Sequence, residues 1–198
     1  MYNTREIRWF TPKENKSISQ WFNNRGLFFS EVEKRTDMYL VIPGNEEVNI
    51  KLREGNIEIK TRTGKPESSH LIPGMEMLVE KWVKWSFTTR KDDELSQKII
   101  ENKYNWLAVD KTRLGVILGQ DDQYSEKFYD IGKSLPDGCQ IEYTRIKVKN
   151  QQWFSFNLEF FGENPPVLKS DTLIEITGKV PLNPECCMGY PRFLQKFT

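Results

Sequence analysis

Three pairs of basic residues in this sequence have the spacing Lys-x-Arg. They are Lys51 with Arg53, Lys60 with Arg62, and Lys111 with Arg113. Side chains two residues apart point to the same face of a β-strand, so each pair can present two cations together. The first two pairs lie in one stretch, VNIKLREGNIEIKTR, residues 48–62. A face of this kind either meets water or lines a site that attracts an anion.

The residues between these cations predict the structure that carries them. Ile50 and Leu52 alternate with polar residues in the first half of the stretch, and Ile57 and Ile59 do so in the second. Strict alternation indicates half-buried strands, and the Gly-Asn at the joint indicates a hairpin. One face of this hairpin is apolar, and the other carries the four cations and the carboxylate of Glu58.

Composition limits the class of protein. A chain of 198 residues corresponds to one domain, residues 1–198, and 37% hydrophobic with 13% aromatic residues is enough for a folded core. The net charge is +1, so no overall basic field favours a membrane surface or nucleic acid, and neither is an expected partner. An anion site must therefore come from a local arrangement of charges.

The sequence indicates no targeting segment and no disulfide framework. The start, MYNTREIRWF, lacks the apolar run of a signal peptide, and no stretch approaches the ~18 apolar residues of a membrane span. The adjacent Cys186 and Cys187 with Cys139 form no paired framework, and the single histidine, His70, gives no zinc pattern. A reducing, cytoplasmic setting is the expectation, and the sequence makes no prediction of oligomeric state.

Hydrophobic periodicity predicts further elements along the chain. Apolar residues at helical spacing predict helices at Ser17–Arg25, capped by Ser17 and stopped by Gly26, and at Asp92–Lys103. Thr63–Gly74 is predicted to be a loop and Asp121–Gly138 to be irregular. Strands are expected at Thr4–Phe10, Leu27–Ile42, Met75–Phe87, Asn105–Leu118, Cys139–Lys149 and Trp153–Phe161, with part of a further strand at Leu173–Ile176.

About eight strands with two or three helices indicate an α+β fold that is mainly antiparallel β. Long amphipathic strands at this density favour a closed, tunnel-like barrel of eight strands covered by the helices. The polar face of nearly every strand carries charges of both signs. These faces either meet water around an apolar interior, or line a charged lumen while the helices cover an apolar outer face. The helices need a sheet in both cases and do not decide between them.

The order of the motifs along the chain points to one family. A strand that begins at Glu6 is followed by a short helix, a strand ending in Asp37-x-Tyr39, the Lys-x-Arg hairpin and the run VDKTR. The closing pair of strands contains IEYT and NLE, and the ending GYPRFL looks like a closing helix with its tyrosine. From Glu6 to Leu194, this order resembles the CYTH superfamily, the triphosphate tunnel metalloenzymes.

The resemblance implies an eight-stranded antiparallel tunnel with a charged interior. In this family inward lysines and arginines hold an inorganic or organic triphosphate, and inward glutamates bind Mg²⁺ or Mn²⁺. Several cations in fixed geometry suit a polyphosphate, and hard oxygen ligands suit these metals. The expected ligand is an anionic small molecule: polyphosphate, a nucleotide or another phosphorylated compound. The implied phosphate-binding residues are Arg8, Lys51, Arg53, Lys60, Arg62, Lys111 and Arg113, and the implied metal ligands are Glu6, Glu142 and Glu159.

The sequence departs from the family pattern at four positions. They are Arg8 and Phe10 in the opening motif Glu-x-Glu-x-Lys, Thr144 in the acidic pair that begins at Glu142, and Asn157 in the final Glu-x-Glu that ends at Glu159. Keeping the cations while losing acids preserves attraction for a phosphorylated ligand but weakens the hold on a metal. No catalytic residue is assigned.

Three functions are compatible with the sequence. The first is a metal-dependent phosphohydrolase acting on tripolyphosphate or a small triphosphate. The second is a non-catalytic binder of an anionic small molecule, with a degraded metal site. The third is a barrel with an apolar lumen, which carries a hydrophobic ligand or serves a structural partner; finding the charged hairpin face inside the barrel would eliminate it.

Overall fold

The computed structural model describes residues 2–72, 75–88, 94–101, 105–121, 125–178 and 182–198. Within them, ten strands, four α-helices and two 3₁₀ turns are present. The strands are β1 (Tyr2–Thr11), β2 (Lys34–Leu40), β3 (Val48–Arg53), β4 (Asn56–Arg62), β5 (Glu67–Ile72), β6 (Met75–Thr88), β7 (Trp106–Gln120), β8 (Glu126–Asp130), β9 (Gly138–Val148) and β10 (Gln151–Phe161). The helices are α1 (Lys16–Asn23), α2 (Glu94–Ile100), α3 (Ser170–Thr177) and α4 (Tyr190–Leu194), and the turns are Pro184–Cys186 and Gln195–Phe197.

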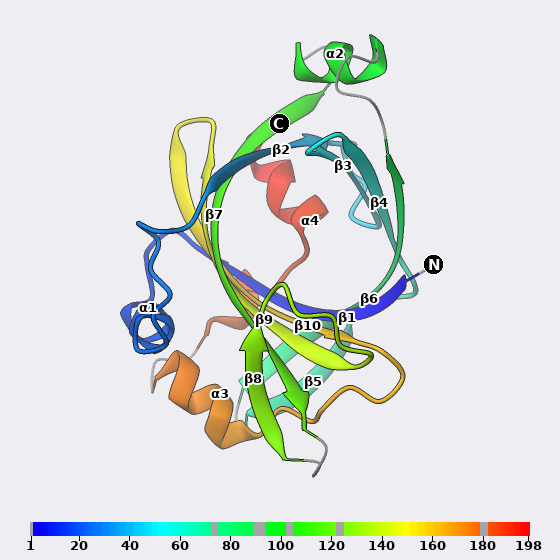
Figure 1. The fold of residues 1–198 in the computed structure, drawn as a ribbon. Coiled ribbons are helices and arrows are strands. Elements are labelled where there is room, and N and C mark those ends of the chain that lie inside the picture. The colour runs from blue at the N-terminus through cyan, green and yellow to red at the C-terminus, as the bar shows by residue number, and fades with distance from the viewer. Residues whose placement is uncertain (1, 73–74, 89–93, 102–104, 122–124, 179–181) are drawn as a thin grey trace.

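Eight of the strands close into an antiparallel barrel, as predicted (Figure 1). The order around the barrel is β1-β10-β9-β7-β2-β3-β4-β6, and β6 pairs back with β1 to complete the ring. Strands β6 and β7 are 14 and 15 residues long and extend past the ring. Their extensions pair with the two extra strands, β5 and β8.

The predicted hairpins are confirmed. Strands β3 and β4 are joined by Glu54 and Gly55, whose φ angles of 50° and 77° are both in the left-handed region that a two-residue hairpin turn requires. Strands β9 and β10 turn at Lys149 and Asn150, one residue earlier than expected, with φ angles of 44° and 63°. Both turns fix which side chains of the paired strands face the same way.

The sequence predictions for three segments are wrong: two segments predicted to be loop or irregular contain strands, and one predicted strand is a helix. The expected loop at Thr63–Gly74 contains β5, which includes His70, and the expected irregular segment at Asp121–Gly138 contains β8. Both are short edge strands that pair on one side only, so neither shows the alternation of a half-buried strand. Leu173–Ile176 was predicted to be part of a strand but lies in helix α3, because a short apolar run is compatible with a strand or a helix.

Two boundaries also differ. Only Lys34–Leu40 of the expected strand at Leu27–Ile42 is extended, and the residues before it form turns. Helix α1 is capped by Asn15, not Ser17: the side-chain oxygen Oδ1 of Asn15 accepts from the backbone N–H groups of Ser17 and Ile18. In the described residues, helix α2 occupies Glu94–Ile100 of the helix expected at Asp92–Lys103. None of the described helices has the length and apolarity needed to cross a membrane.

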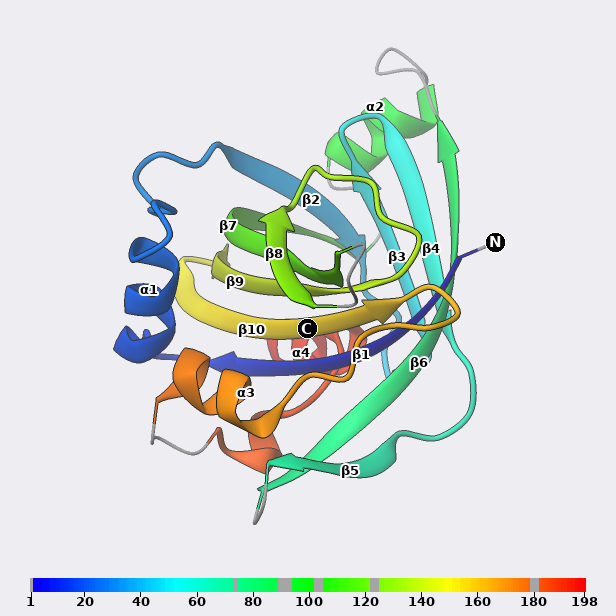
Figure 2. The same cartoon turned by 60° about the horizontal axis from the view of Figure 1, so that its bottom comes forward.

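One hydrophobic core lies outside the barrel. Helices α1 and α3 lie against the outer face of β1 and β10 (Figure 2). Ile18 and Phe22 of α1 are packed with Ile7 and Trp9 of β1 and with outward residues of the neighbouring strands. The helices therefore cover the apolar outer face, which leaves the opposite side chains of these strands for the lumen.

A second core lies inside the barrel, at one end. Helix α4 sits within the ring of strands (Figure 1), where its Phe193 ring stacks on Phe10 at 3.8 Å between centroids. Tyr190 stacks on Tyr39 at 5.2 Å and meets Phe10 edge-on. This inner core fills one end of the barrel and leaves a cavity above it. We call the opposite end of the cavity, which Arg113, Gln140 and Phe161 line, the mouth.

Candidate functional site

The inward side chains of all eight barrel strands surround a cavity of about 510 Å³. Lys51, Arg53 and Lys60 of the hairpin all line it, so the charged face of the hairpin points into the barrel. The alternative of an apolar lumen with outward charges is therefore wrong. The α4 residues Tyr190 and Pro191 contribute to the cavity wall on the side of the inner core.

Cations outnumber carboxylates in the cavity wall. The cationic side chains that line it are Arg8, Arg35, Lys51, Arg53, Lys60, Lys84, Lys111 and Arg113, and the carboxylates are Glu6, Glu58, Glu142 and Glu159. The lining thus has an excess of four positive charges, although the whole chain has a net charge of only +1. A cleft lined by one sign of charge focuses its field and attracts counter-ions.

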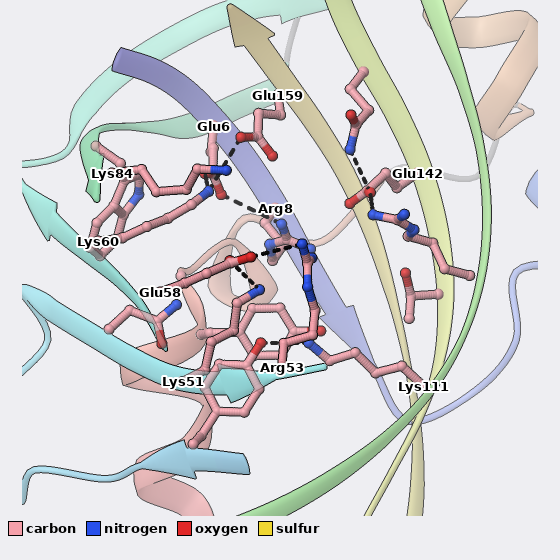
Figure 3. A pocket seen from close by; sticks show the side chains of 18 of the residues that line it. Glu6, Arg8, Lys51, Arg53, Glu58, Lys60, Lys84, Lys111, Glu142 and Glu159 are labelled. Carbon is pink, nitrogen blue, oxygen red and sulfur yellow. Dashed lines mark hydrogen bonds and ion pairs between the residues drawn. The ribbon is translucent and has the colours of Figure 1, made fainter. Parts of the chain in front are cut away.

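Three of the carboxylates occupy one wall, formed by β1, β10 and β9. Glu6 lies opposite Glu159 in the register of β1 and β10, while Arg8 lies opposite Asn157, which in turn lies opposite Glu142. The side chain of Arg8 therefore projects from the middle of the acidic wall (Figure 3). A guanidinium nitrogen of Arg8 is 3.4 Å from a carboxylate oxygen of Glu6.

Each of these three carboxylates is neutralised by a cation of the protein. The Lys60 ammonium donates to Glu6 and lies 3.2 Å from Glu159, so it bridges the two. Arg113 donates to Glu142 at 2.6 Å. The acidic wall is thus held by ion pairs that reach it from β4, β7 and β1 itself.

The electrostatics of the wall follow from these pairs. Burial alone would raise the pKa of the Glu6 carboxyl, but Lys60 and Arg8 lower it to about 2. Burial would likewise raise the pKa of Glu142, and Arg113 and Arg8 bring it below its ordinary value. Burial and the neighbouring Glu6 charge instead raise the pKa of Glu159. Glu6 and Glu142 are therefore the firmly ionised partners, and Glu159 holds a proton more readily.

The predicted metal ligands meet at one cavity but are already occupied. Among the described residues, no group of three or more His, Cys, Asp or Glu side chains is arranged to hold a metal ion. A divalent ion at Glu6, Glu142 and Glu159 would have to displace Lys60 and Arg8, because their charges take the place that a metal charge would take. The residues present therefore do not fit Mg²⁺ or Mn²⁺ in this arrangement, and metal binding stays a prediction.

The opposite wall is basic. Lys51 and Arg53 of β3 share one carboxylate, Glu58, at 2.9 Å and 2.7 Å (Figure 3). Lys111 of β7 donates to Asp37 at 2.9 Å and to the hydroxyl of Tyr39 at 2.5 Å. In the basic wall two cations therefore share each carboxylate, whereas in the acidic wall Lys60 bridges two carboxylates.

Two lysines of the basic wall are perturbed. Burial, then the Lys111 charge, lowers the pKa of the Lys51 ammonium to about 8. Burial also lowers the pKa of Lys111 to about 8, although Asp37 opposes this effect, and Arg35 and Arg8 add to it. Residues in a cleft whose pKa is strongly shifted by burial and a nearby charge are candidates for a functional site, although ion-pair networks shift pKa values too.

The structure brings together nine of the ten residues assigned from the sequence. The exception is Arg62, which lies in β4 with the same parity as Lys60 but does not line the cavity. Its guanidinium lies 3.1 Å from Glu80 and 3.6 Å from Glu47. The burial of Glu80 raises its pKa, and Arg62 opposes that rise by pairing with it.

Several lining residues were not assigned from the sequence. Arg35 and Lys84 extend the basic wall. Arg35 has the same strand parity as Asp37, and Lys84 has the same parity as Glu80, so the alternation of polar residues could have placed both on the charged face. Strand parity says nothing about Tyr190 and Pro191, but the resemblance indicated a closing helix with its tyrosine at GYPRFL, and α4 is that helix. The described lining residues without an assigned role are Arg35, Tyr39, Asn49, Glu58, Trp82, Lys84, Gln140, Thr144, Phe161, Gly189, Tyr190 and Pro191.

The departures from the family pattern have local partners. Phe10 stacks on Phe193 in the inner core. The Asn157 amide donates to Glu142 at 3.4 Å. Comparison of the sequence with models of known protein families and with curated proteins gives no significant match. The relation to the triphosphate tunnel enzymes therefore stays a prediction from the residues.

Proposed function

We propose that this barrel binds a polyanionic small molecule in its lumen and does so without a metal ion. The observation that carries the proposal is the charge of the cavity wall: eight cationic and four carboxylate side chains face one space of about 510 Å³. All four carboxylates already have cationic partners in the protein. Asp37, just behind the wall, neutralises one further charge through Lys111 and Arg35, so the remaining excess matches a ligand with about three or four negative charges, such as a polyphosphate or a nucleoside triphosphate.

The kinds of cation support a phosphorylated ligand. Arginine presents a planar fork of donors that matches two oxygens of a phosphate, and lysine supplies a compact point charge. Arg8, Arg53 and Arg113 are distributed over three strands around the cavity. A cavity of this size lies within the range of roughly 300–1,000 Å³ that holds an organic ligand of moderate size.

We propose on the same grounds that the chain is a divergent member of the triphosphate tunnel superfamily. A closed ring of eight antiparallel strands, inward Lys-x-Arg pairs and a helix near the C-terminus support this relation. A shared fold does not deliver a shared activity, so the function is argued from the site.

The test is thermal unfolding with tripolyphosphate, ATP or pyrophosphate, each in EDTA and each with Mg²⁺ or Mn²⁺. A ligand present at 100 times its dissociation constant stabilises the folded state by about 2.7 kcal/mol. We expect tripolyphosphate and ATP to raise the melting temperature in EDTA. The Lys60→Gln variant should lose much of this shift, because it removes a cation of the cavity.

Lys81→Gln is the matched control. Lys81 lies on β6 but points away from the lumen, where it pairs with Glu67 at 2.6 Å. Its removal should leave the shift unchanged. If no anion raises the melting temperature of the unmodified protein, with or without metal, the proposed function is wrong.

A second candidate is a metal-dependent phosphohydrolase. The observation that favours it is the convergence of Glu6, Glu142 and Glu159 on one cavity. This activity would require Mg²⁺ or Mn²⁺ to displace Lys60 and Arg8 from these carboxylates. The measurement is phosphate release from tripolyphosphate with either metal, compared with Glu159→Gln. Release that needs the metal and disappears in the variant would establish this candidate over simple binding.

A further inference from the structure

We propose that the inner end of the cavity is a subsite for a terminal phosphate-like group, formed by Lys51, Lys111 and Arg8 around the ring of Tyr190. This inference rests on the proposed function, since it assigns one part of the same lumen to one part of the ligand. It adds a direction: the ligand enters through the mouth with its most charged end first.

The C-terminal helix holds two of these cations. The Lys111 ammonium lies 4.1 Å from the centre of the Tyr190 ring, and the Arg8 guanidinium lies 4.9 Å from it. Lys111 and Arg8 come from β7 and β1, which do not pair with each other. A ring face attracts a cation, so Tyr190 fixes both groups at the boundary between cavity and inner core.

The third cation reaches the same region from β3. Lys51 lies opposite Tyr39 in the register of β3 and β2, and Lys111 donates to the Tyr39 hydroxyl, so Tyr39 brings the two lysines to the same end of the cavity. Burial lowers the pKa of both lysines to about 8, and the Lys111 charge adds to this shift at Lys51. Arg8 is among the cations that act on Lys111. Like charges gathered in a buried space repel one another, and an anion between them relieves the repulsion.

The surrounding charges do not fully compensate the two lysines, whereas Arg8 is paired with Glu6 at 3.4 Å and also faces Glu142 and Glu159. The charged and titratable groups around Lys111 are Asp37, Arg35 and Tyr39 of β2, Arg8 of β1, Lys51 of β3 and Tyr190 of α4. The charged groups around Lys51 are Glu58 of β4, Asp37, Arg53 and Lys111. Glu58 is shared with Arg53, and Asp37 is shared with Arg35, which lies 3.3 Å away. Each carboxylate near the two lysines thus has a further cation to neutralise.

The geometry favours a tetrahedral terminal group. Tyr190 and Pro191 line the cavity, and the inner core lies behind them, so a ligand cannot extend further in this direction. Donors that approach from three strands suit a group with three outward oxygens, and a carboxylate has only two. A terminal phosphate, or a sulfate of the same shape, fits this description.

The experiment compares orthophosphate and tripolyphosphate on two lysine variants. Lys84 lines the same cavity from β6, across the ring from β7 and Lys111, where it is in register with Tyr2 of β1 and Lys60 of β4. We expect Lys51→Gln to weaken orthophosphate binding by about tenfold or more, the effect of losing a charge-assisted hydrogen bond. Lys84→Gln should leave orthophosphate affinity within about threefold while weakening tripolyphosphate.

A second set of variants separates positioning from stability. Tyr190→Leu removes the ring and should weaken orthophosphate binding, and Tyr190→Phe keeps the ring and should restore it. Phe193→Leu is the control within α4: Phe193 is fully buried, contacts Phe10, Trp153 and Phe197, and meets the Tyr190 ring edge-on at 6.3 Å, so it tests whether a loss of packing beside Tyr190 is enough to weaken binding. It should lower the melting temperature and leave the affinity unchanged.

The outcomes distinguish the two proposals. If tripolyphosphate does not bind the unmodified protein, the proposed function fails and the subsite fails with it. If tripolyphosphate binds but Lys51→Gln and Lys84→Gln weaken orthophosphate equally, only the subsite is wrong. The subsite is also wrong if orthophosphate at millimolar concentration does not compete with tripolyphosphate, or if Phe193→Leu weakens it as much as Tyr190→Leu.

Discussion

The two ends of the lumen are built from the same strands with opposite chemistry. The inward positions of β1 change from Glu6 and Arg8 to Phe10 within five residues. Those of β9 change from Glu142 to Ile146 in the same direction along the barrel. The alternation of side chains along a strand determines which of them face inward. Their position along the barrel axis determines whether these inward side chains line the cavity or pack against the aromatic rings of α4.

The two ends also contribute differently to stability. The inner core removes apolar and aromatic surface from water, which is the main stabilising term in folding. The charged end holds ionised groups at low exposure, which costs free energy unless every charge is well compensated. We therefore expect substitutions at the inner core to act on stability, and substitutions at the charged end to act mainly on binding.

The largest effect is expected from Phe193→Ala. Phe193 is fully buried and stacks on Phe10, so truncation leaves a large cavity in the inner core. The free energy of unfolding should fall by about 3–5 kcal/mol, measured by urea denaturation. Lys51→Gln is the comparison at the charged end and should change stability far less, because Arg53 still neutralises Glu58. A loss below about 1 kcal/mol for Phe193→Ala would show that α4 is not held as described.

A smaller effect is expected where the two ends meet. Gly189 lies just before α4, and a Cβ atom there would be 2.4 Å from the Glu80 carboxylate, which Arg62 holds at 3.1 Å. Gly189→Ala should therefore lower the free energy of unfolding by about 1–3 kcal/mol, since Glu80 and Arg62 must shift together. Gly132→Ala is the control, because nothing lies within 4 Å of a Cβ at that position. Equal effects of the two substitutions would refute this account of Gly189.

Much of the charged end could be predicted from the sequence, because it depends on local alternation. Lys51 and Lys60 belong to a hairpin whose turn residues and parity are explicit, and parity alone places them on one face. That this face points inward came from the resemblance, since alternation is the same for either orientation. Arg62 shows the limit: its parity is right, but Glu80 from β6 draws its guanidinium away from the cavity.

The inner end could not be predicted in the same way. Phe10 reads as a lost lysine in the sequence, and its role becomes clear only with Phe193, which is 183 residues further along the chain. Helix α4 is five residues long and has too few turns for a periodic signal. Likewise β5 and β8 exist because the long strands β6 and β7 offer them an edge, which no local pattern records.

The smallest effect is a pH dependence that has opposite signs for stability and binding. Lys51 and Lys111 have a pKa of about 8 in the folded protein, below the ordinary value of 10.5. Below pH 8 both are charged in the folded and unfolded states, and the folded state carries the full cost of their burial. Between pH 8 and 10.5 the folded protein releases these protons first, so their contribution to the free energy of unfolding rises.

Anion affinity should fall across the same window, because neutral amines no longer attract the ligand. Urea denaturation without ligand and tripolyphosphate binding, each at pH 7 and pH 9.5, measure the two effects. Lys51→Gln should reduce both changes, and Phe193→Leu should preserve both, since the inner core contributes no titrating lysine. If stability and anion affinity both fall above pH 8, the two lysines are not held charged against one another. The two ends of the lumen would then differ in shape alone.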